Sequence, residues 1–323
     1  MNGFIEKCLI SALLCCLCVR ANAQENIVKD IEEMGTFDHW TVRVIEESSI
    51  IGGATTYLYE PTAVNDTIYG RQAYVNPEGC VWRTSNAYAD VLGVVKTSTS
   101  VFPEKRGDGY CARMEVRMAH LKVLGLINMD VACQGSMFLG RLQEPIKDTK
   151  NPQGKLLFGF PFTDMPKGLQ LDYKAIVGGD AVRATGLSRV KPLGYKDYAD
   201  LVLMLQYRWE DEKGNVYAYR VGTAYERITK TVTEWQNAHF LPVKYGDITS
   251  DPDFRPYMGL IKEELSNYTL NSKGESVPVH EIGWAKPGMK PNWLIIRFSS
   301  SYGVAFEGAI GNTLWIDNVK LVY

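Results

Sequence analysis

The last thirteen residues of the chain, Gly311-Asn-Thr-Leu-Trp-Ile-Asp-Asn-Val-Lys-Leu-Val-Tyr323, have the alternation of a β-strand. At a period of two residues, one face carries Trp315, Asp317, Val319, Leu321 and Tyr323. Asp317 interrupts an otherwise apolar row, and a buried ionised carboxylate is costly unless it is paired, hydrogen-bonded or bound to a cation. A chain that ends on a core strand closes its fold there, so we expect earlier strands to pair with this one.

Earlier segments repeat this alternation. In residues 110–118 one face carries Tyr110, Ala112, Met114, Val116 and Met118, and the other carries Cys111, Arg113, Glu115 and Arg117. An apolar face opposite a polar face is typical of an antiparallel sheet with one solvated side. The pattern recurs in residues 169–175 and 201–209, and a turn at 211–215 leads from the second of these into 216–221 as a β-hairpin. Further strands are expected at 41–45, 55–59, 235–245 and 293–299.

Two long stretches, 135–166 and 247–291, are weakly patterned and look like decorated loops. Strands at irregular spacing joined by long loops predict an all-β fold, an antiparallel jelly-roll β-sandwich rather than a tight barrel. Ahead of it, Ile27, Val28, Ile31 and Met34 have helical spacing and Gly35 is a plausible stop, which predicts a short N-terminal helix. We therefore divide the chain into a leader segment at 24–36 and one domain at 37–323.

The first 23 residues have the pattern of a secretory signal peptide. Lys7 precedes an apolar run at 8–19, and Ala21-Asn-Ala23 is a small-x-small cleavage site. The run is too short to span a membrane, and no later segment approaches a spanning length. We therefore predict export to the periplasm or the cell surface, with no transmembrane segment. Lipoprotein anchoring is less favoured, because the residues before Cys15, Cys16 and Cys18 are not the Gly or Ala of a lipobox.

Charge and cysteine usage exclude several classes of protein. The formal net charge is −2 and no block of like charge stands out, so nucleic acid and anionic membranes are poor candidate partners. Cys80, Cys111 and Cys133 follow the signal and allow one disulfide at most, which the sequence leaves open. Four histidines without a metal-binding spacing disfavour a zinc site. No pattern indicates an oligomeric state.

Four separated motifs occur in an order associated with one family. They are Trp82-Arg-Thr-Ser-Asn86, Gly109-Tyr-Cys-Ala-Arg113, Phe298-Ser-Ser-Ser301 with Gly303, and the terminal stretch 311–321. Over most of residues 37–323 the chain resembles the PCMD (putative carbohydrate metabolism domain) proteins exported by glycan-foraging Gram-negative bacteria. The resemblance implies a jelly-roll related to galactose-binding-like carbohydrate modules. It supplies a carbohydrate setting and no catalytic residues.

Carbohydrate modules of this kind often hold a structural calcium ion where the first and last strands meet. Asp317 matches the acidic position of the final-strand motif, and Asp38 lies where the opening acid sits. Calcium takes about six to eight oxygen ligands, which two strand ends and a loop can supply. The alternative is that Asp317 caps backbone N–H groups or pairs with Arg or Lys. Asp38 stands where Glu is more usual, and Asn318 stands where a second acid is common, which lowers the available charge.

Aromatic side chains bind sugars by stacking on a pyranose ring while nearby polar groups contact the hydroxyls. Tyr207, Trp209, Trp293 and Trp315 follow apolar periodicity and are assigned to the core. The candidate ligand-binding aromatic residues are Trp82, Tyr88, Trp235 and Trp284, which lie in less regular segments. Trp82 with Arg83 and Asn86 is the first choice, because it combines a stacking face with hydroxyl-binding groups. Arg113 and Glu115 either line a polar groove or form cross-strand pairs.

The leading prediction is an exported, non-catalytic carbohydrate-binding protein. Its alternative is a glycoside hydrolase or lyase, with Glu115 or Asp172 among the possible acids. Such an enzyme needs two suitably separated carboxylates, which sequence spacing cannot identify. A GxSxG elbow, a P-loop and a dinucleotide fingerprint are all missing from the sequence. A second alternative is a structural or adhesive protein that recognises protein. Binding predicts an aromatic strip beside polar groups, catalysis a cleft with converging carboxylates, and adhesion a broad apolar patch.

Overall fold

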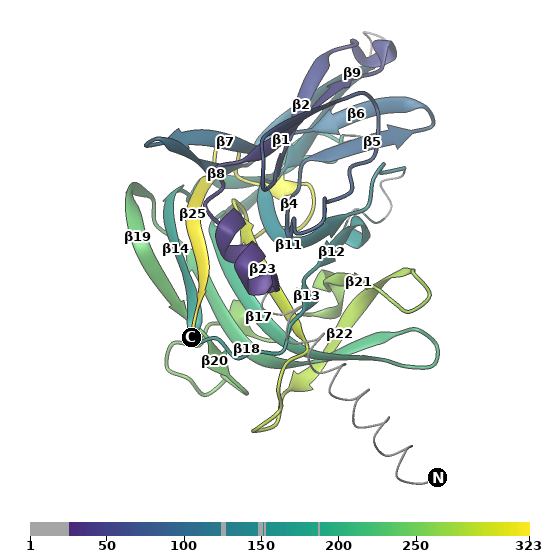
Figure 1. Ribbon diagram of the computed structural model, residues 1–323. Coiled ribbons are helices and arrows are strands. Elements are labelled where there is room, and N and C mark those ends of the chain that lie inside the picture. Colours follow the sequence, from purple (N-terminus) through teal and green to yellow (C-terminus); the bar gives the residue numbers. More distant parts are fainter. Residues whose placement is uncertain (1–25, 124–126, 148–150, 152, 187) are drawn as a thin grey trace.

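The structure is a computed structural model that describes residues 26–323 apart from 124–126, 148–150, 152 and 187 (Figure 1). The predicted signal peptide at 1–23 therefore lies outside the described residues. Two large sheets dominate the fold and several small sheets extend from one end of it (Figure 1). No helix in the described part of the chain is long and apolar enough to cross a membrane.

The terminal stretch forms β25 (Thr313–Val322), which is the middle strand of a five-stranded sheet. The sheet has the order β19-β14-β25-β8-β7, with β19 (Val232–Pro242), β14 (Gly168–Ile176), β8 (Gly109–Glu115) and β7 (Val101–Arg106). β25 runs antiparallel to both β14 and β8. The expectation that earlier strands pair with the last one is confirmed.

The second large sheet bends into a ring of seven strands. Its order is β23 (Trp293–Ser299), β17 (Ala199–Glu210), β18 (Val216–Ile228), β22 (Ser276–Trp284), β21 (Tyr268–Leu270), β12 (Leu156–Phe158) and β11 (Ser136–Leu142). β11 also pairs with β23, at Ser136 to Phe138, and this pairing closes the ring. Strands β4 (Trp82–Thr84), β13 (Phe160–Pro161) and β20 (Lys244–Tyr245) pair with its members from outside the circuit.

The main hydrophobic core lies between the five-stranded sheet and the outer face of the ring. From the sheet it takes Leu169, Leu171, Ala175, Met114, Leu314, Ile316, Val319 and Leu321. From the ring it takes Leu201, Leu203, Leu205, Leu294, Ile296, Phe298, Met137 and Leu139. Burial of this apolar surface, at roughly 25 cal/mol per Å², is the main force that holds the two sheets together.

A second core lies on the inner face of the ring. The ring strands alternate, so the residues between those of the main core point inward. They include Phe138, Phe158, Val202, Met204 and Ile295. The segment between β20 and β21, which contains the 3₁₀ helices η3 (Pro256–Met258) and η4 (Glu263–Leu265), packs Tyr257, Met258 and Ile261 against this core. The inside of the ring is therefore partly filled by a loop.

Smaller elements complete the structure. They are β1 (Trp40–Glu46), β2 (Thr55–Pro61) and β3 (Asp66–Tyr69) in one sheet, β5 (Ala87–Val91) with β6 (Val94–Ser98), β9 (Arg117–Val123) with β10 (Ile127–Cys133), and β15 (Asp180–Arg183), β16 (Lys191–Lys196) and β24 (Glu307–Gly308). Short 3₁₀ helices are η1 (Ser49–Ile51) and η2 (Gln153–Lys155).

Residues 26–34 form the expected helix near the N-terminus, which buries Ile31 and Met34 in the main core (Figure 1). It ends at Gly35, whose carbonyl accepts a hydrogen bond from Val319 N at 2.9 Å. A Cβ atom at Gly35 would lie 2.3 Å from the carbonyl oxygen of Val319, so the close approach of helix and strand requires glycine.

The all-β prediction is confirmed, but the ring differs from the predicted jelly-roll. The two stretches interpreted as decorated loops contain β11, β12, β21 and β22, which are four of the seven ring strands. The strand predicted to run to residue 118 stops at Glu115, since Val116 leaves the ladder and β9 begins at Arg117. Cys80, Cys111 and Cys133 are free thiols.

The predicted face of Asp317 is also wrong. The core-facing residues of β25 change register at a bulge: Leu314 and Ile316 precede it, and Val319 and Leu321 follow it. Asn318 has a φ of 50°, and the pairing with β14 shifts between Gln170 and Asp172. Asp317 therefore lies on the outer face of the sheet, beside Trp315, and not in the apolar row.

Candidate functional site

The platform predicted at Trp82, Arg83 and Asn86 is buried. Trp82 is 1% exposed and stacks on Phe298 with ring centroids 5.8 Å apart. Asn86 is 0% exposed; its Nδ2 donates to the carbonyl of Val101 at 2.9 Å, and its Oδ1 accepts from the N–H of Val101 at 3.0 Å. The prediction of a sugar platform at Trp82 is wrong, because a buried indole offers no face to a sugar.

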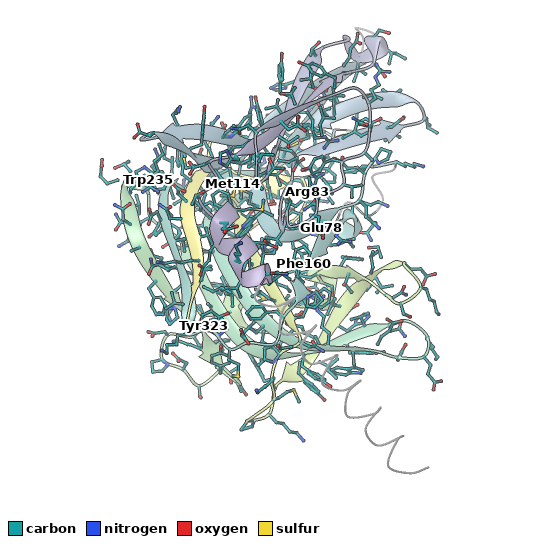
Figure 2. All side chains as sticks on the ribbon, in the orientation of Figure 1. Glu78, Arg83, Met114, Phe160, Trp235 and Tyr323 are labelled. Carbon is teal, nitrogen blue, oxygen red and sulfur yellow. The ribbon has the colours of Figure 1, made fainter. Side chains whose placement is uncertain are left out.

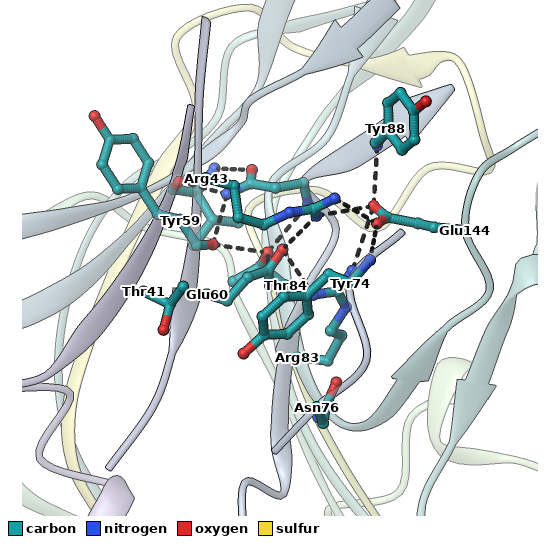
Figure 3. A network of polar contacts seen from close by, with 12 residues as sticks. Thr41, Arg43, Tyr59, Glu60, Tyr74, Asn76, Arg83, Thr84, Tyr88 and Glu144 are labelled. Carbon is teal, nitrogen blue, oxygen red and sulfur yellow. Dashed lines mark hydrogen bonds and ion pairs between the residues drawn. The ribbon is translucent and has the colours of Figure 1, made fainter. Parts of the chain in front are cut away.

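Arg83 belongs to a buried network of two arginines and two glutamates (Figure 3). Its Nη1 lies 2.7 Å from Glu60 Oε1, and its Nη2 lies 3.3 Å from Glu144 Oε1. Arg43 reaches the same two carboxylates, with Nη2 2.7 Å from Glu144 Oε2 and Nη1 3.4 Å from Glu60 Oε1. All four side chains are at most 2% exposed. Burial raises the pKa of Glu60 against the opposing effect of the arginines. The network is structural, since no ligand can reach it.

The other aromatic candidates lie in three different sheets. Tyr88 on β5 is 4% exposed and packs in a small apolar cluster. Trp284, the last residue of β22, is half-buried, with the guanidinium of Arg220 5.8 Å from its ring. Trp235 on β19 is half-buried at the outer edge of the five-stranded sheet (Figure 2), where the guanidinium of Arg106 lies 3.8 Å from its ring. These residues form no common platform.

Arg113 and Glu115 form ion pairs on the outer face of the five-stranded sheet. Arg113 Nη1 lies 2.8 Å from Glu115 Oε2, and Arg113 Nε lies 3.0 Å from Glu104 Oε2 on the neighbouring strand β7. The guanidinium of Arg113 also packs 4.6 Å from the ring of Phe102. The geometry matches ion pairing rather than a groove: Arg113 makes one cross-strand pair, with Glu104, and one pair along its own strand, with Glu115. Each charge is compensated within the sheet.

The two predicted calcium ligands lie near β8 but are otherwise engaged. Asp317 Oδ2 accepts from Arg106 Nη1 at 2.6 Å, so the alternative of an ion pair is realised there. The other terminal nitrogen of Arg106 lies 2.8 Å from Asp172 Oδ2. Asp38 Oδ1 accepts from the backbone N–H of Tyr110 at 2.9 Å. A guanidinium thus occupies the position of the expected cation at Asp317, and calcium stays a prediction.

The two carboxylates bound by Arg106 have pKa values that shift in opposite directions. Burial raises the pKa of Asp317 to about 6, although the hydrogen bonds from Arg106 and from Asn318 N oppose it. Burial also acts to raise the pKa of Asp172. Hydrogen bonds from Ala238 N, the Asn318 side chain and Arg106 outweigh it and hold that pKa below its ordinary value.

A cleft at one end of the ring is the candidate functional site. Asp200 lies near the start of β17, Arg227 near the end of β18 and Arg297 near the end of β23, so antiparallel pairing brings all three to the same end. The cleft has a volume of about 490 Å³ and is also lined by the segment 256–267 and by 302–304. Small-molecule sites commonly occupy about 300–1,000 Å³. The cleft is large enough for a short saccharide.

Tyrosines and a bound arginine form one wall of this cleft. Asp200 accepts two hydrogen bonds from Arg227, at 2.7 and 2.9 Å, and a third from the hydroxyl of Tyr225 at 2.6 Å. The guanidinium of Arg227 lies 3.9 Å from the ring of Tyr302 and 4.5 Å from the ring of Tyr257. The site is thereby preorganised, because the ion pair fixes the arginine against two aromatic rings.

The electrostatics of this wall keep its groups in fixed protonation states. Burial and the neighbouring Asp200 raise the pKa of Tyr225, so its hydroxyl stays protonated and donates to the carboxylate. Burial acts to lower the pKa of Arg227, but its hydrogen bonds to Asp200 outweigh this effect and raise it. Asp200 is 1% exposed and both its oxygens are occupied. These groups suit binding better than proton transfer.

None of the residues predicted as ligands lines the cleft. The sequence did carry one signal: in residues 199–210 Leu201, Leu203 and Leu205 alternate with Val202 and Met204, so both faces are apolar. A strand of this composition is typically buried on both sides. The second apolar face thus indicated an inner core, and Asp200 is the polar residue at the end of that strand.

Comparisons with known proteins add little to this picture. No family model matches the chain, and no curated protein does. Among solved structures, the chain is similar to one from Bacteroides thetaiotaomicron described as a "putative glycoside hydrolase". The TM-score is 0.46 and the identity 21%, over 87% of this chain and 70% of the other. A TM-score below 0.5 establishes no shared fold, so function has to be argued from the chain's own residues.

Proposed function

We propose that the protein is an exported, non-catalytic carbohydrate-binding protein whose binding site is the cleft at the end of the ring. The observation that carries this proposal is the combination of tyrosine rings with fixed hydrogen-bonding groups in one cleft. Tyr257 and Tyr302 line the cleft with their rings packed against Arg227, and Asn267 offers amide donors. Sugars are bound by such a pairing of aromatic faces with a few polar groups. The signal-like N-terminus and the PCMD-like motifs support export and a glycan setting.

A glycoside hydrolase or lyase is the alternative, and the carboxylates argue against it. Hydrolysis needs an acid and a second carboxylate on opposite sides of the scissile bond. Among the described residues lining the cleft, the carboxylates are Asp200, held by Arg227 and Tyr225, and the exposed Glu264. The acids first considered, Glu115 and Asp172, lie outside it.

The test is a glycan-array screen of residues 24–323, followed by titration of the best binder. We expect Tyr257→Ala to weaken binding roughly tenfold, because a buried aromatic contact is worth more than about 1 kcal/mol. Tyr69→Ala is the matched control, since Tyr69 is 73% exposed on β3 and lies outside the cleft. Unchanged binding in Tyr257→Ala would place the site elsewhere, and absence of any hit would overturn the proposal in favour of protein recognition.

The same preparation distinguishes binding from hydrolysis. Each glycan that binds is incubated with the protein and assayed for new reducing ends or unsaturated products. We expect none. Product formation that is lost in Asp200→Asn would instead identify the cleft as a glycosidase or lyase site.

A further inference from the structure

We infer that the glycan bound in the cleft carries an anionic substituent, a carboxylate or a sulfate, and that Arg297 binds it. The inference rests on the proposed function, because it names the class of glycan for the same cleft. Four observations carry it: the position of Arg297, the ion pair of Asp200 with another arginine, the net positive charge of the residues that line the cleft, and a buried amide among those residues.

Arg297 lies on the inner face of the ring. In register it is opposite Val202 on β17 and Phe138 on β11, and both of these belong to the inner core. It lines the cleft and is half-buried. Within the described part of the chain, its guanidinium has neither an ion-pair partner nor a hydrogen bond. Arg297 is therefore a cation with no ion-pair or hydrogen-bond partner among the described residues, beside apolar side chains of the inner core.

The carboxylate that shares this face of the ring is already paired with another arginine. Asp200 is two residues from Val202 on β17, so it shares the inner face with Arg297. Its Oδ1 accepts from Arg227 Nε, and its Oδ2 accepts from Arg227 Nη2 and from the Tyr225 hydroxyl. The bidentate pair with Arg227 therefore compensates the charge of Asp200.

The remaining lining residues add to the surplus positive charge. Its cations are Arg227, Arg297 and Lys262, and its anions are Asp200 and Glu264, which leaves a net charge of +1. Asn267 also lines the cleft, and only 7% of it is exposed. Among the described residues its side-chain amide has no hydrogen-bond partner. The amide is a second donor for an anionic group.

A carboxylate or sulfate fits this arrangement better than a hydroxyl does. Guanidinium presents its donors in a planar fork that matches the two oxygens of such an anion. A half-buried cation is poorly solvated, so an anionic ligand gains attraction that a neutral sugar cannot supply. A neutral hydroxyl could accept one hydrogen bond from Arg297 but would leave its charge uncompensated. The cleft therefore selects acidic over neutral glycans.

The experiment is a panel of matched glycans in which the same backbones are neutral, carboxylated or sulfated. Binding is measured with the wild type, with Arg297→Gln and with Arg189→Gln, an exposed arginine outside the cleft that controls for the loss of one positive charge. We expect acidic members to bind tighter than their neutral counterparts. Arg297→Gln should weaken acidic binding by about 10–100-fold, as for the loss of a charged hydrogen bond, while Arg189→Gln changes it less than twofold.

The outcomes separate the inference from the function on which it rests. Preference for carboxylated or for sulfated members identifies which anion the cleft takes, provided that Arg297→Gln abolishes the preference. Equal binding of neutral and acidic members, lost in Tyr257→Ala and unchanged in Arg297→Gln, overturns the inference and leaves the carbohydrate site. Binding of no glycan overturns both. Urea unfolding of Arg297→Gln, together with Arg297→Lys as a charge-conserving variant, shows whether a loss reflects unfolding.

Discussion

Replacing Glu144 by Gln in the buried network of Figure 3 should destabilise the protein severely. The Glu144 side chain is 0% exposed and lies 2.7 Å from Arg43 and 3.3 Å from Arg83. Its Oε1 accepts from Tyr88 N and its Oε2 from Tyr74 N, both at 3.0 Å. Glutamine would keep one acceptor oxygen and direct an NH₂ group at a donor N–H. The variant would also leave two buried arginines with one carboxylate.

Removal of one partner from a buried ion pair costs about 3–5 kcal/mol, because the other charge remains desolvated and unpaired. For a domain of this size, with an unfolding entropy of about 2.1 cal/mol/K per residue, that corresponds to a fall in Tm of roughly 5–8 °C. The assay is urea unfolding followed by tryptophan fluorescence and circular dichroism. The control is Asp180→Asn, which breaks the exposed pair with Lys196, where the side chains are 83% and 53% exposed. It should change stability by less than about 1 kcal/mol.

A double variant tests the physical reason. Glu60→Leu with Arg83→Met removes one charge of each sign, from groups 2.7 Å apart, and leaves Arg43 paired with Glu144. We expect it to be less destabilised than the sum of its two single variants, since the coupling energy is shared. A cost for Glu144→Gln as small as that of Asp180→Asn would refute the reasoning, as would strict additivity in the double variant.

Three further predictions concern other sites. In a ¹³C titration the Asp317 carboxyl should have a midpoint near 6. Between the ordinary pKa of 3.8 and 6 the folded state then holds more protons than the unfolded state, so this group lowers the free energy of unfolding as pH rises through that window. A midpoint below 4 would contradict the burial argument. Gly35→Ala should lower the free energy of unfolding by about 1–3 kcal/mol in urea titrations, since its Cβ would lie 2.3 Å from the Val319 carbonyl oxygen; an unchanged midpoint would mean that helix and strand separate freely. Burial raises the pKa of Cys111 to about 12, so its thiol should resist a disulfide reagent at pH 8 until urea unfolds the chain, and rapid labelling of the native protein would count against it.

Strands β8, β14 and β25 of the five-stranded sheet could be predicted from sequence because their residues alternate between apolar and polar, whereas β7 was not predicted. The alternation around Met114 and Leu171 gave the correct faces. At β25 the predicted core face was right for Val319 and Leu321 and wrong for Trp315 and Asp317, since a bulge at Asn318 adds a residue and reverses the faces. No local signal in the sequence announces such a bulge.

The ring and its cleft were harder to predict for a different reason. Short strands such as β12 and β21, three residues each, are too brief to show a period and therefore looked like loops. The candidate site depends on tertiary pairing: Asp200, Arg227 and Arg297 come from three strands and meet only when the ring closes. Trp82 was misplaced because its irregular segment, which suggested a surface, belongs to a three-residue strand in the core.

The position of β25 has a consequence for how the chain acquires its structure during and after synthesis. This strand separates β8 from β14, yet it follows both by a long stretch of sequence. Until it is inserted, each of those strands presents an unpaired edge, and their apolar faces stay open to solvent or to other chains. Contacts between segments so distant in sequence form slowly. A chaperone that shields these edges would therefore matter most in the interval before residues 313–322 are synthesised and inserted, when β-edge aggregation competes with folding.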